Sequence, residues 1–109
     1  MEVPNADKFM IIVVLSEFFG IMTYSLAVNL NDGTHIVSLI MFTMIIITQG
    51  ISGGHLNPAL TFAVYIERNK FVSYACWAFT IILAQMIGSF GGLGMGWLLR
   101  VTMPGPNGT

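Results

Sequence analysis

The stretch that decides the fold runs from residue 52 to residue 66 and reads SGGHLNPALTFAVYI. Gly53 and Gly54 allow backbone conformations that other residues rarely adopt, so the chain can turn sharply before a helix begins. Asn57 is a favoured N-cap residue, and Pro58 suits the first position of a helix. We expect a helix from Pro58 to about residue 66, roughly 14 Å long, which is about half the hydrocarbon thickness of a bilayer. A helix of that length enters the membrane without crossing it.

The sequence on either side of this stretch is apolar enough to cross a bilayer three times. Hydrophobic residues make up 55% of the 109 residues, charged residues only 8%, and the mean hydropathy is +0.80. A hydrocarbon core about 30 Å thick takes about 20 apolar residues in a helix. The spans that we expect are residues 9–30, 35–51 and 71–99. The sequence therefore predicts an all-α membrane protein with three transmembrane helices plus one re-entrant half-helix.

The two ends of the chain carry no long apolar run. Residues 1–8 contain acidic residues and no arginine, so we expect a retained N-terminal segment and not a cleaved targeting peptide. Residues 101–109 end in MPGPNGT, which has no periodicity and predicts an extended tail. The membrane unit that we expect is residues 9–100.

Composition and charge exclude several classes of protein. Four Lys/Arg and five Asp/Glu residues give a net charge of −1, so there is no basic surface for nucleic acid. The single cysteine, Cys76, cannot form a disulfide within the chain or a thiolate metal site. We recognise no nucleophile with a base, no carboxylate pair and no phosphate loop, and so expect no enzyme, metal or cofactor. The lipid bilayer is the partner that the composition implies.

The residues at 52–61 resemble the first Asn-Pro-Ala signature of the aquaporin and glycerol-facilitator family, the major intrinsic proteins. Residues 16–20 (SEFFG) and 84–88 (AQMIG) resemble motifs in the first and third helices of that family. The resemblance extends over nearly the whole chain and implies a single aquaporin-like half-repeat. Family members have two inverted repeats, and this chain matches only the first.

Two features of the family pattern have no counterpart in this chain. The second repeat brings another Asn-Pro-Ala and an arginine that lines the selectivity filter, whereas the arginines here are Arg68 and Arg100. The filter position that family members often fill with an aromatic residue, twenty residues before the signature asparagine, is Val37. A pore mouth built on Val37 would be wider and less polar than a water-selective one. We expect that one chain does not enclose a family-type pore.

The start of the half-helix, Asn57, Pro58 and Ala59, is the candidate pore site. A helix N-terminus carries about half a positive charge, which repels cations, and the amide of Asn57 can donate hydrogen bonds to a water or a hydroxyl. The alternative is that Asn57 only caps the helix and bonds neighbouring backbone. The sequence leaves both interpretations open.

Glu17 places a carboxyl group in the middle of a span, where it is energetically expensive. The resemblance implies that this glutamate braces the re-entrant loop by accepting backbone hydrogen bonds, and we favour that role over a proton relay. The loop residues concerned are Ser52, Gly53, Gly54 and His55. We expect His55 to hold the loop and not to bind metal, because the loop offers no second ligand.

Small residues recur at every fourth position of the third span. They are Ala84, Gly88, Gly92 and Gly96, and Gly91 and Gly94 widen the stripe. Such a helix face lets another helix approach closely. Its partner is either the first span or half-helix of the same chain, or a helix of another subunit.

Two functional hypotheses follow from the sequence. The first, which we prefer, is an accessory or structural subunit of a larger membrane complex, packed against other membrane subunits. The alternative is half of a passive channel for water or small neutral solutes, completed by a second chain. Lys8, Arg68 and Lys70 fall on one side and only Arg100 on the other, which predicts that the N-terminus is cytoplasmic or equivalent.

Overall fold

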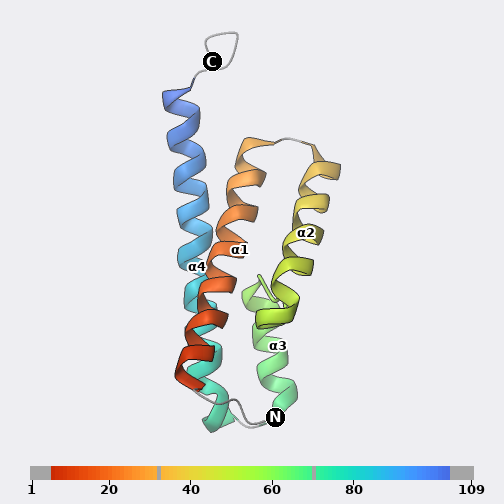
Figure 1. Ribbon diagram of the computed structural model, residues 1–109, viewed down its shortest axis with the longest axis vertical. Helices are drawn as coiled ribbons and strands as arrows, with labels where there is room; N and C mark the ends of the chain where they lie inside the picture. The colour runs from red at the N-terminus through yellow and green to blue at the C-terminus, as the bar shows by residue number, and fades with distance from the viewer. Residues whose placement is uncertain (1–5, 32, 70, 104–109) are drawn as a thin grey trace.

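The computed structural model of the protein describes residues 6–31, 33–69 and 71–103. These residues form α-helices joined by short connections, with no strand among them: α1 (Ala6–Leu30), α2 (Thr34–Ser52), α3 (Pro58–Arg68) and α4 (Phe71–Thr102). In Figure 1, α1 and α4 run in the same direction and α2 runs in the opposite direction. The short α3 lies near the end of the molecule where α1 begins. Residues 1–5 and 104–109, which include most of the expected terminal segments, lie outside the described residues.

Three of the helices are long and apolar enough to cross a membrane. Their spans are Met10–Leu30, Thr34–Ser52 and Tyr74–Thr102. The fourth, α3, has 11 residues and is about 16 Å long, which is too short to cross a hydrocarbon core of about 30 Å. The predicted fold class is confirmed: the protein is an all-α, multi-pass membrane protein with a single short helix beside three long ones.

Several helices extend beyond the spans read from the sequence. α1 begins at Ala6 and not at residue 9, α3 ends at Arg68 and not at 66, and α4 ends at Thr102 and not at 99. Arg68 and Arg100 lie in the last turns of their helices, where a positive charge interacts favourably with the C-terminal end of the helix dipole. These charges therefore end the apolar stretch without ending the helix.

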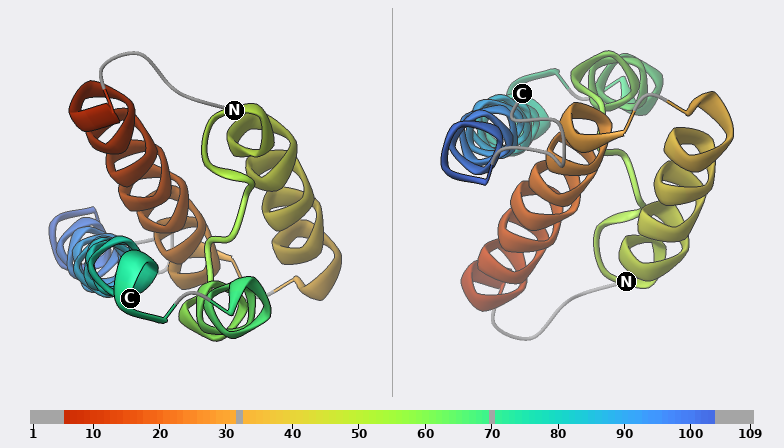
Figure 2. Two further views of the ribbon diagram at one scale, coloured as in Figure 1. Left: turned by 90° about the horizontal axis from the view of Figure 1, so that it is seen from below. Right: turned by 90° about the horizontal axis from the view of Figure 1, so that it is seen from above.

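α1 is the centre of the packing. It contacts both α2 and α4, and α3 contacts α4. Seen along the long axis, α1 lies between α2 and α4, and the connection from α2 to α3 passes beside α1 (Figure 2). The loop before α3 is therefore enclosed by protein on the side that faces α1.

The small-residue stripe of α4 lies against α1. A Cβ atom built on Gly88 would be 2.5 Å from the carbonyl oxygen of Phe18, and one on Gly92 would meet backbone atoms of Met22 and Leu26. At Gly96 the space is taken by the side chain of Asn29, and Ala84 is buried as well. Glycine therefore lets the two backbones approach closely at Gly88 and Gly92, and Gly96 leaves room for the Asn29 side chain.

The outer positions of the stripe make little or no contact. Gly91 would bring a Cβ only to ordinary van der Waals distance of Met22, and Gly94 has nothing within 4 Å. Of the two partners that the sequence left open, the described structure places α1 of the same chain against the stripe.

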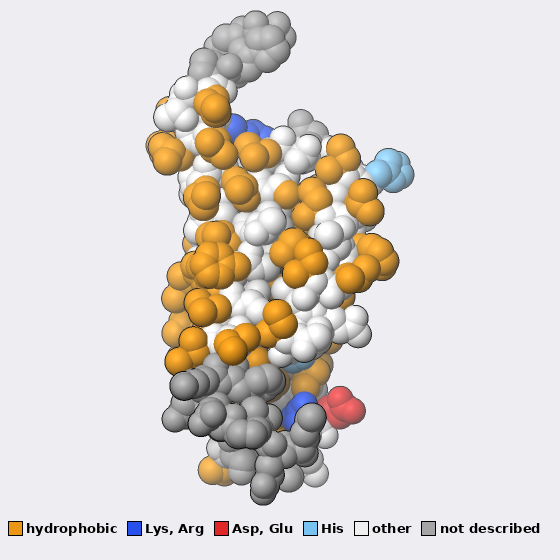
Figure 3. All heavy atoms as spheres, viewed as in Figure 1, with side chains coloured by type: hydrophobic (Ala, Val, Ile, Leu, Met, Phe, Trp, Pro, Cys, Tyr) orange, Lys and Arg blue, Asp and Glu red, His pale blue; other side chains and the backbone are white. Residues whose placement is uncertain are grey.

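Many large apolar side chains are exposed on the helices, and Figure 3 shows them spread among other side chains over one face of the molecule. α2 is the most exposed span, with 6% of its most apolar window buried. Its exposed apolar residues include Ile36, Leu39, Phe42, Ile46 and Ile47. A patch of this extent is unfavourable in water but suits contact with hydrocarbon or with other membrane helices.

Candidate functional site

The loop between α2 and α3 uses left-handed backbone at three residues. Gly53 has φ 92°, and its N–H donates to the carbonyl of Gln49 to cap α2. Gly54 has φ 65°, which glycine adopts at little cost. Leu56 has φ 49°, a conformation that costs a residue with a Cβ atom about 1–2 kcal/mol. The contacts around Leu56 must offset this strain.

The contacts around Leu56 come from α1 and α2. Its side chain is 1% exposed and fills the space above Gly20, where an added Cβ atom would lie 2.6 Å from Leu56 Cδ2. The same Cβ atom would lie 3.2 Å from the methyl group of Thr48 on α2. Gly20 thus provides the hollow that receives Leu56, and this packing fixes the residue immediately before Asn57.

Glu17 is the polar centre beneath the loop, and its side chain is fully buried. Oε1 accepts hydrogen bonds from the hydroxyl of Ser52 at 2.5 Å and from the N–H of His55 at 3.1 Å. Oε2 accepts from the N–H of Leu56 at 2.7 Å and from Nε2 of Gln85 at 2.8 Å. Hydrogen bonds to a carboxylate are among the stronger ones in proteins. Four of them join α1, the end of α2, the loop and α4 at one side chain.

A second set of hydrogen bonds joins the loop to α3 and α4. Nε2 of Gln85 also donates to the hydroxyl oxygen of Thr61 at 3.0 Å, and this oxygen lies 3.0 Å from Nδ1 of His55. Thr61 and Gln85 are buried, and the imidazole of His55 packs edge-on against Trp77. Oε1 of Gln85 has no hydrogen-bond partner among the described residues. The network ties the first turn of α3 to both neighbouring spans.

Asn57 caps α3 with one half of its side-chain amide. Oδ1 accepts from the N–H of Ala59 at 2.8 Å, which leaves Nδ2 without a partner in the described part of the chain. Asn57 and Ala59 are exposed, and Pro58 occupies the first helical turn and is half-buried. The cap therefore orients the oxygen toward the helix while the two N–H donors of the amide remain free. Capping and an outward-facing donor are compatible at this residue.

The structure brings most of the residues singled out in the sequence into one region, but not all of them. Val37 lies in the first turn of α2, half-buried, about 22 Å along the helix from the end that joins the loop. It is therefore remote from Asn57. The glycines of α4 belong to the contact with α1 and not to the loop.

Four residues of the site lie in the stretches that resemble the family but were given no role of their own from the sequence: Gly20, Leu56, Thr61 and Gln85. Gln85 carried a signal, because a glutamine inside an apolar span needs a partner. Thr61 lies four residues after the N-cap Asn57 and therefore on the same face of α3. Because Asn57 adjoins the loop, the sequence could have placed Thr61 near the loop. Leu56 carried none, because left-handed backbone at a leucine follows from tertiary contacts and not from local preference.

The sequence matches a known protein family and several curated relatives. The family model described as major intrinsic protein matches residues 6–107. An aquaporin of PIP type from Atriplex canescens is 36% identical over 66 residues, which is 61% of this chain and 21% of that protein. Aquaporin PIP2-1 from Arabidopsis thaliana is 39% identical over 54 residues, 50% of this chain and 18% of that protein.

Probable aquaporin PIP2-2 from Oryza sativa subsp. japonica is 38% identical over 55 residues, again 50% of this chain and 18% of that protein. The chain thus covers about a fifth of the length of these curated relatives. No solved structure gave a significant match. Because the family model covers nearly all of the sequence, the chain belongs to the major intrinsic protein family.

Proposed function

We propose that this chain forms one wall of a passive pathway for water or small neutral solutes, with the opposite wall supplied by a second half-repeat. The observation that carries the proposal is Asn57, whose amide caps α3 through Oδ1, while Nδ2, on an exposed residue, has no partner among the residues that the structure describes. A donor at the N-terminal end of a short helix suits a hydroxyl or a water oxygen. The partial positive charge of that helix end disfavours cations.

The proposal assigns a supporting role to the buried residues beneath the loop. Loop backbone at membrane depth is tolerated only where protein or water satisfies its polar groups. Glu17 accepts from the N–H groups of His55 and Leu56 and from the hydroxyl of Ser52. In this account Glu17 braces the loop, Gly53 and Gly54 allow its turns, and His55 joins it to α3. No proton transfer through Glu17 is required.

The proposed half-repeat, residues 9–100, needs a partner of opposite orientation. Inverted repeats in membrane transporters are related by an axis in the membrane plane, so a second identical copy would have to insert the other way. Arg68 lies at the α3–α4 end and Arg100 at the other end. With Lys8 and Lys70, whose side chains lie outside the described set, the bias favours a cytoplasmic N-terminus and a heterologous second half.

The test joins this chain to the missing half. The second repeat of aquaporin PIP2-1 from Arabidopsis thaliana would be fused after residue 103, and osmotic shrinkage of proteoliposomes would be followed by stopped flow. We expect the fusion protein to raise water permeability above that of empty vesicles. A fusion protein that folds, by helical content and monodispersity, yet leaves permeability at the lipid value would refute the proposal.

Asn57→Asp is the informative variant in that assay. Aspartate is as good an N-cap as asparagine, so α3 keeps its start, but the variant replaces the free N–H donors with a second acceptor oxygen. We expect water permeability to fall by about tenfold, as for loss of roughly 1.4 kcal/mol of stabilisation along the path. Asn69→Asp, at the other end of α3, is the matched control and should leave permeability unchanged.

A second candidate function is a structural subunit of a larger membrane assembly. The exposed apolar face of α2 favours it, because α1 is the helix that α2 contacts among the described residues and most of its apolar window is not buried. Mild detergent extraction from the source membrane distinguishes the two. A stoichiometric complex with several other proteins, combined with a fusion protein that does not conduct, would favour the structural role.

A further inference from the structure

An arginine and two aromatic rings form a cluster where α3 ends and α4 begins. The guanidinium carbon of Arg68, in the last turn of α3, lies 5.2 Å from the ring centre of Tyr74 and 5.7 Å from that of Trp77. The two rings are neighbours on one face of α4 and meet edge to face. Arg68 is exposed, whereas Tyr74 and Trp77 are half-buried. We call these three side chains the Arg68 cluster.

The cluster prepares the guanidinium of Arg68 for an anionic ligand. Aromatic faces attract a guanidinium, and stacking restricts a side chain that is otherwise flexible. Glu67 is the adjacent acidic residue, but residues at i and i+1 of a helix do not face each other. The planar fork of N–H donors in arginine matches the oxygens of a phosphate group. The cluster therefore suits a phosphate better than a single carbonyl or a water.

Two features of the fold place the cluster at the membrane surface, and the first is the depth of α3. Leu56 packs on Gly20, the middle residue of the span Met10–Leu30, so a span centred in the bilayer puts the start of α3 near the middle of the hydrocarbon core. The 11 residues of α3 cover about 16 Å, and half of a core of about 30 Å is about 15 Å. Arg68, at the far end of α3, then lies at the boundary between hydrocarbon and headgroups.

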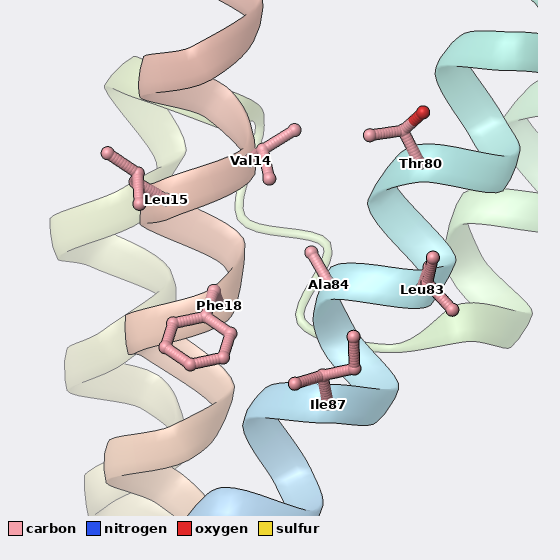
Figure 4. A pocket seen from close by; sticks show the side chains of 7 residues that line it. All are labelled: Val14, Leu15, Phe18, Thr80, Leu83, Ala84 and Ile87. Carbon is pink, nitrogen blue, oxygen red and sulfur yellow. The ribbon is translucent and has the colours of Figure 1, made fainter.

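The second feature is the change of surroundings along α4. Its apolar span begins at Tyr74. Figure 4 shows the stretch that follows, where Thr80, Leu83 and Ile87 border a pocket against α1, and none of the residues lining this pocket is charged. Tyrosine and tryptophan are enriched at membrane interfaces, because their rings are apolar while the OH and N–H groups are polar. Both features therefore give the cluster the same depth.

The phosphate groups found at this depth belong to lipid headgroups. We propose that the Arg68 cluster binds the phosphate of a phospholipid in the leaflet on the α3–α4 side. The guanidinium of Arg68 donates N–H bonds to the phosphate oxygens, and the rings of Tyr74 and Trp77 hold it in place. This contact anchors the end of α3 that is remote from Asn57. It does not depend on whether the Asn57 end conducts solute.

Solid-state NMR between arginine nitrogen and lipid phosphorus tests the contact directly. The chain contains two arginines, Arg68 and Arg100, so ¹⁵N-arginine labelling gives few signals. The full chain would be reconstituted in mixed phosphatidylglycerol and phosphatidylcholine in a phosphate-free buffer, and ¹⁵N–³¹P dipolar dephasing would be measured. We expect a guanidinium signal about 4 Å from phosphorus, as for an N–H bond to a phosphate oxygen, and its loss in Arg68→Gln. No dephased signal, or one unchanged in Arg68→Gln, would overturn the proposal.

A second sample distinguishes a lipid headgroup from a free phosphate ion. The labelled protein would be kept in a maltoside detergent, which contains no phosphorus, and given inorganic phosphate at the phosphate concentration of the lipid sample. We expect little dephasing of the Arg68 signal, because the membrane holds a headgroup beside the cluster whereas a dissolved ion is not held there. Dephasing by inorganic phosphate as strong as that by lipid would refute a lipid site.

A matched pair of variants tests the aromatic part of the cluster. Short-chain phosphatidylglycerol would be titrated into the protein in maltoside detergent and its adducts counted by native mass spectrometry. We expect the apparent affinity to fall about threefold in Tyr74→Leu, equivalent to about 0.7 kcal/mol, and to stay unchanged in Phe79→Leu, an exposed ring elsewhere on α4. Equal affinities in the two variants, both helical by circular dichroism, would contradict the assignment. Should Tyr74→Leu not fold, the dipolar measurement on the unmodified protein decides alone.

Discussion

At the scale of single residues, the carboxylate of Glu17 accepts hydrogen bonds from the loop, and the amide of Asn57 caps α3 through its oxygen. Glu17 accepts from Ser52, His55, Leu56 and Gln85, so one side chain joins four segments of the chain. Asn57 uses its oxygen as a helix cap, which fixes the direction of its nitrogen. Leu56 links the two residues, because its N–H donates to Glu17, its side chain is buried against Gly20, and Asn57 follows it in the chain.

Replacing Glu17 by glutamine tests the bracing contact. Glutamine keeps the size of the side chain but turns one acceptor oxygen into a donor that faces other donors. A buried group left without a partner costs about 1–3 kcal/mol, so we expect the free energy of unfolding to fall by about 2 kcal/mol. Unfolding in mixed detergent micelles, followed by circular dichroism, measures it. Glu67→Gln, an exposed change at the end of α3, should have almost no effect, and equal losses in the two variants would contradict the role of Glu17.

The local signals in the sequence account for some of these residues and not for others. Asn57 and Pro58 mark the start of a helix through backbone preference alone, and α3 begins at Pro58. A carboxylate inside an apolar span points to buried donors, but not to which ones. Leu56, Thr61 and Gln85 depend on contacts between residues far apart in the chain, which local preference does not encode.

At the scale of elements, the contact between α1 and α4 depends on glycine. The four-residue period of small residues identifies the face of α4 that approaches another helix, but it does not identify that helix. The structure supplies the partner, because Gly88, Gly92 and Gly96 meet α1. Nearer the start of both helices, the hydrogen bond between Glu17 and Gln85 joins α1 to α4.

A pair of glycine variants tests this contact. A Cβ atom at Gly92 would meet the backbone of Met22 and Leu26 and Cβ of Ser25, so Gly92→Ala must push α1 away. Overpacking of this kind costs about 1–3 kcal/mol, and we expect the unfolding free energy to fall by that amount. Gly94→Ala adds the same methyl group where nothing lies within 4 Å. It should be neutral or stabilising by up to about 1 kcal/mol, since alanine favours helix. Detergent unfolding that ranks the two variants the other way would rule out this packing.

At the scale of the whole molecule, the fold is three long apolar helices packed about α1, with the short helix α3 against α4. The lengths of the apolar stretches predicted the three spans, because a helix needs about 20 apolar residues to cross the hydrocarbon core. They did not predict where the helices end, since Arg68 and Arg100 lie beyond the apolar stretch and still within a helix. α2 contacts α1 and leaves most of its surface exposed, so the molecule presents a broad apolar face to lipid or to a second half-repeat.

The proposed role of the half-helix depends on the position and surroundings of Asn57. A nitroxide label would be placed at residue 57 of the fusion protein in a Cys76→Ser background, with labels at Phe42 and Glu67 as references. Power-saturation electron paramagnetic resonance would then compare collisions with oxygen, which enters lipid, and with a water-soluble nickel complex. Phe42 should report lipid, and Glu67 should report the membrane surface.

We predict that the label at residue 57 lies about 15 Å below the membrane surface, near the centre of a hydrocarbon core of about 30 Å. At that depth it should collide with the nickel complex far more often than the label at Phe42 does. A label at residue 57 that behaves like Phe42, or that lies as shallow as Glu67, would contradict a half-helix that opens onto water in the middle of the membrane.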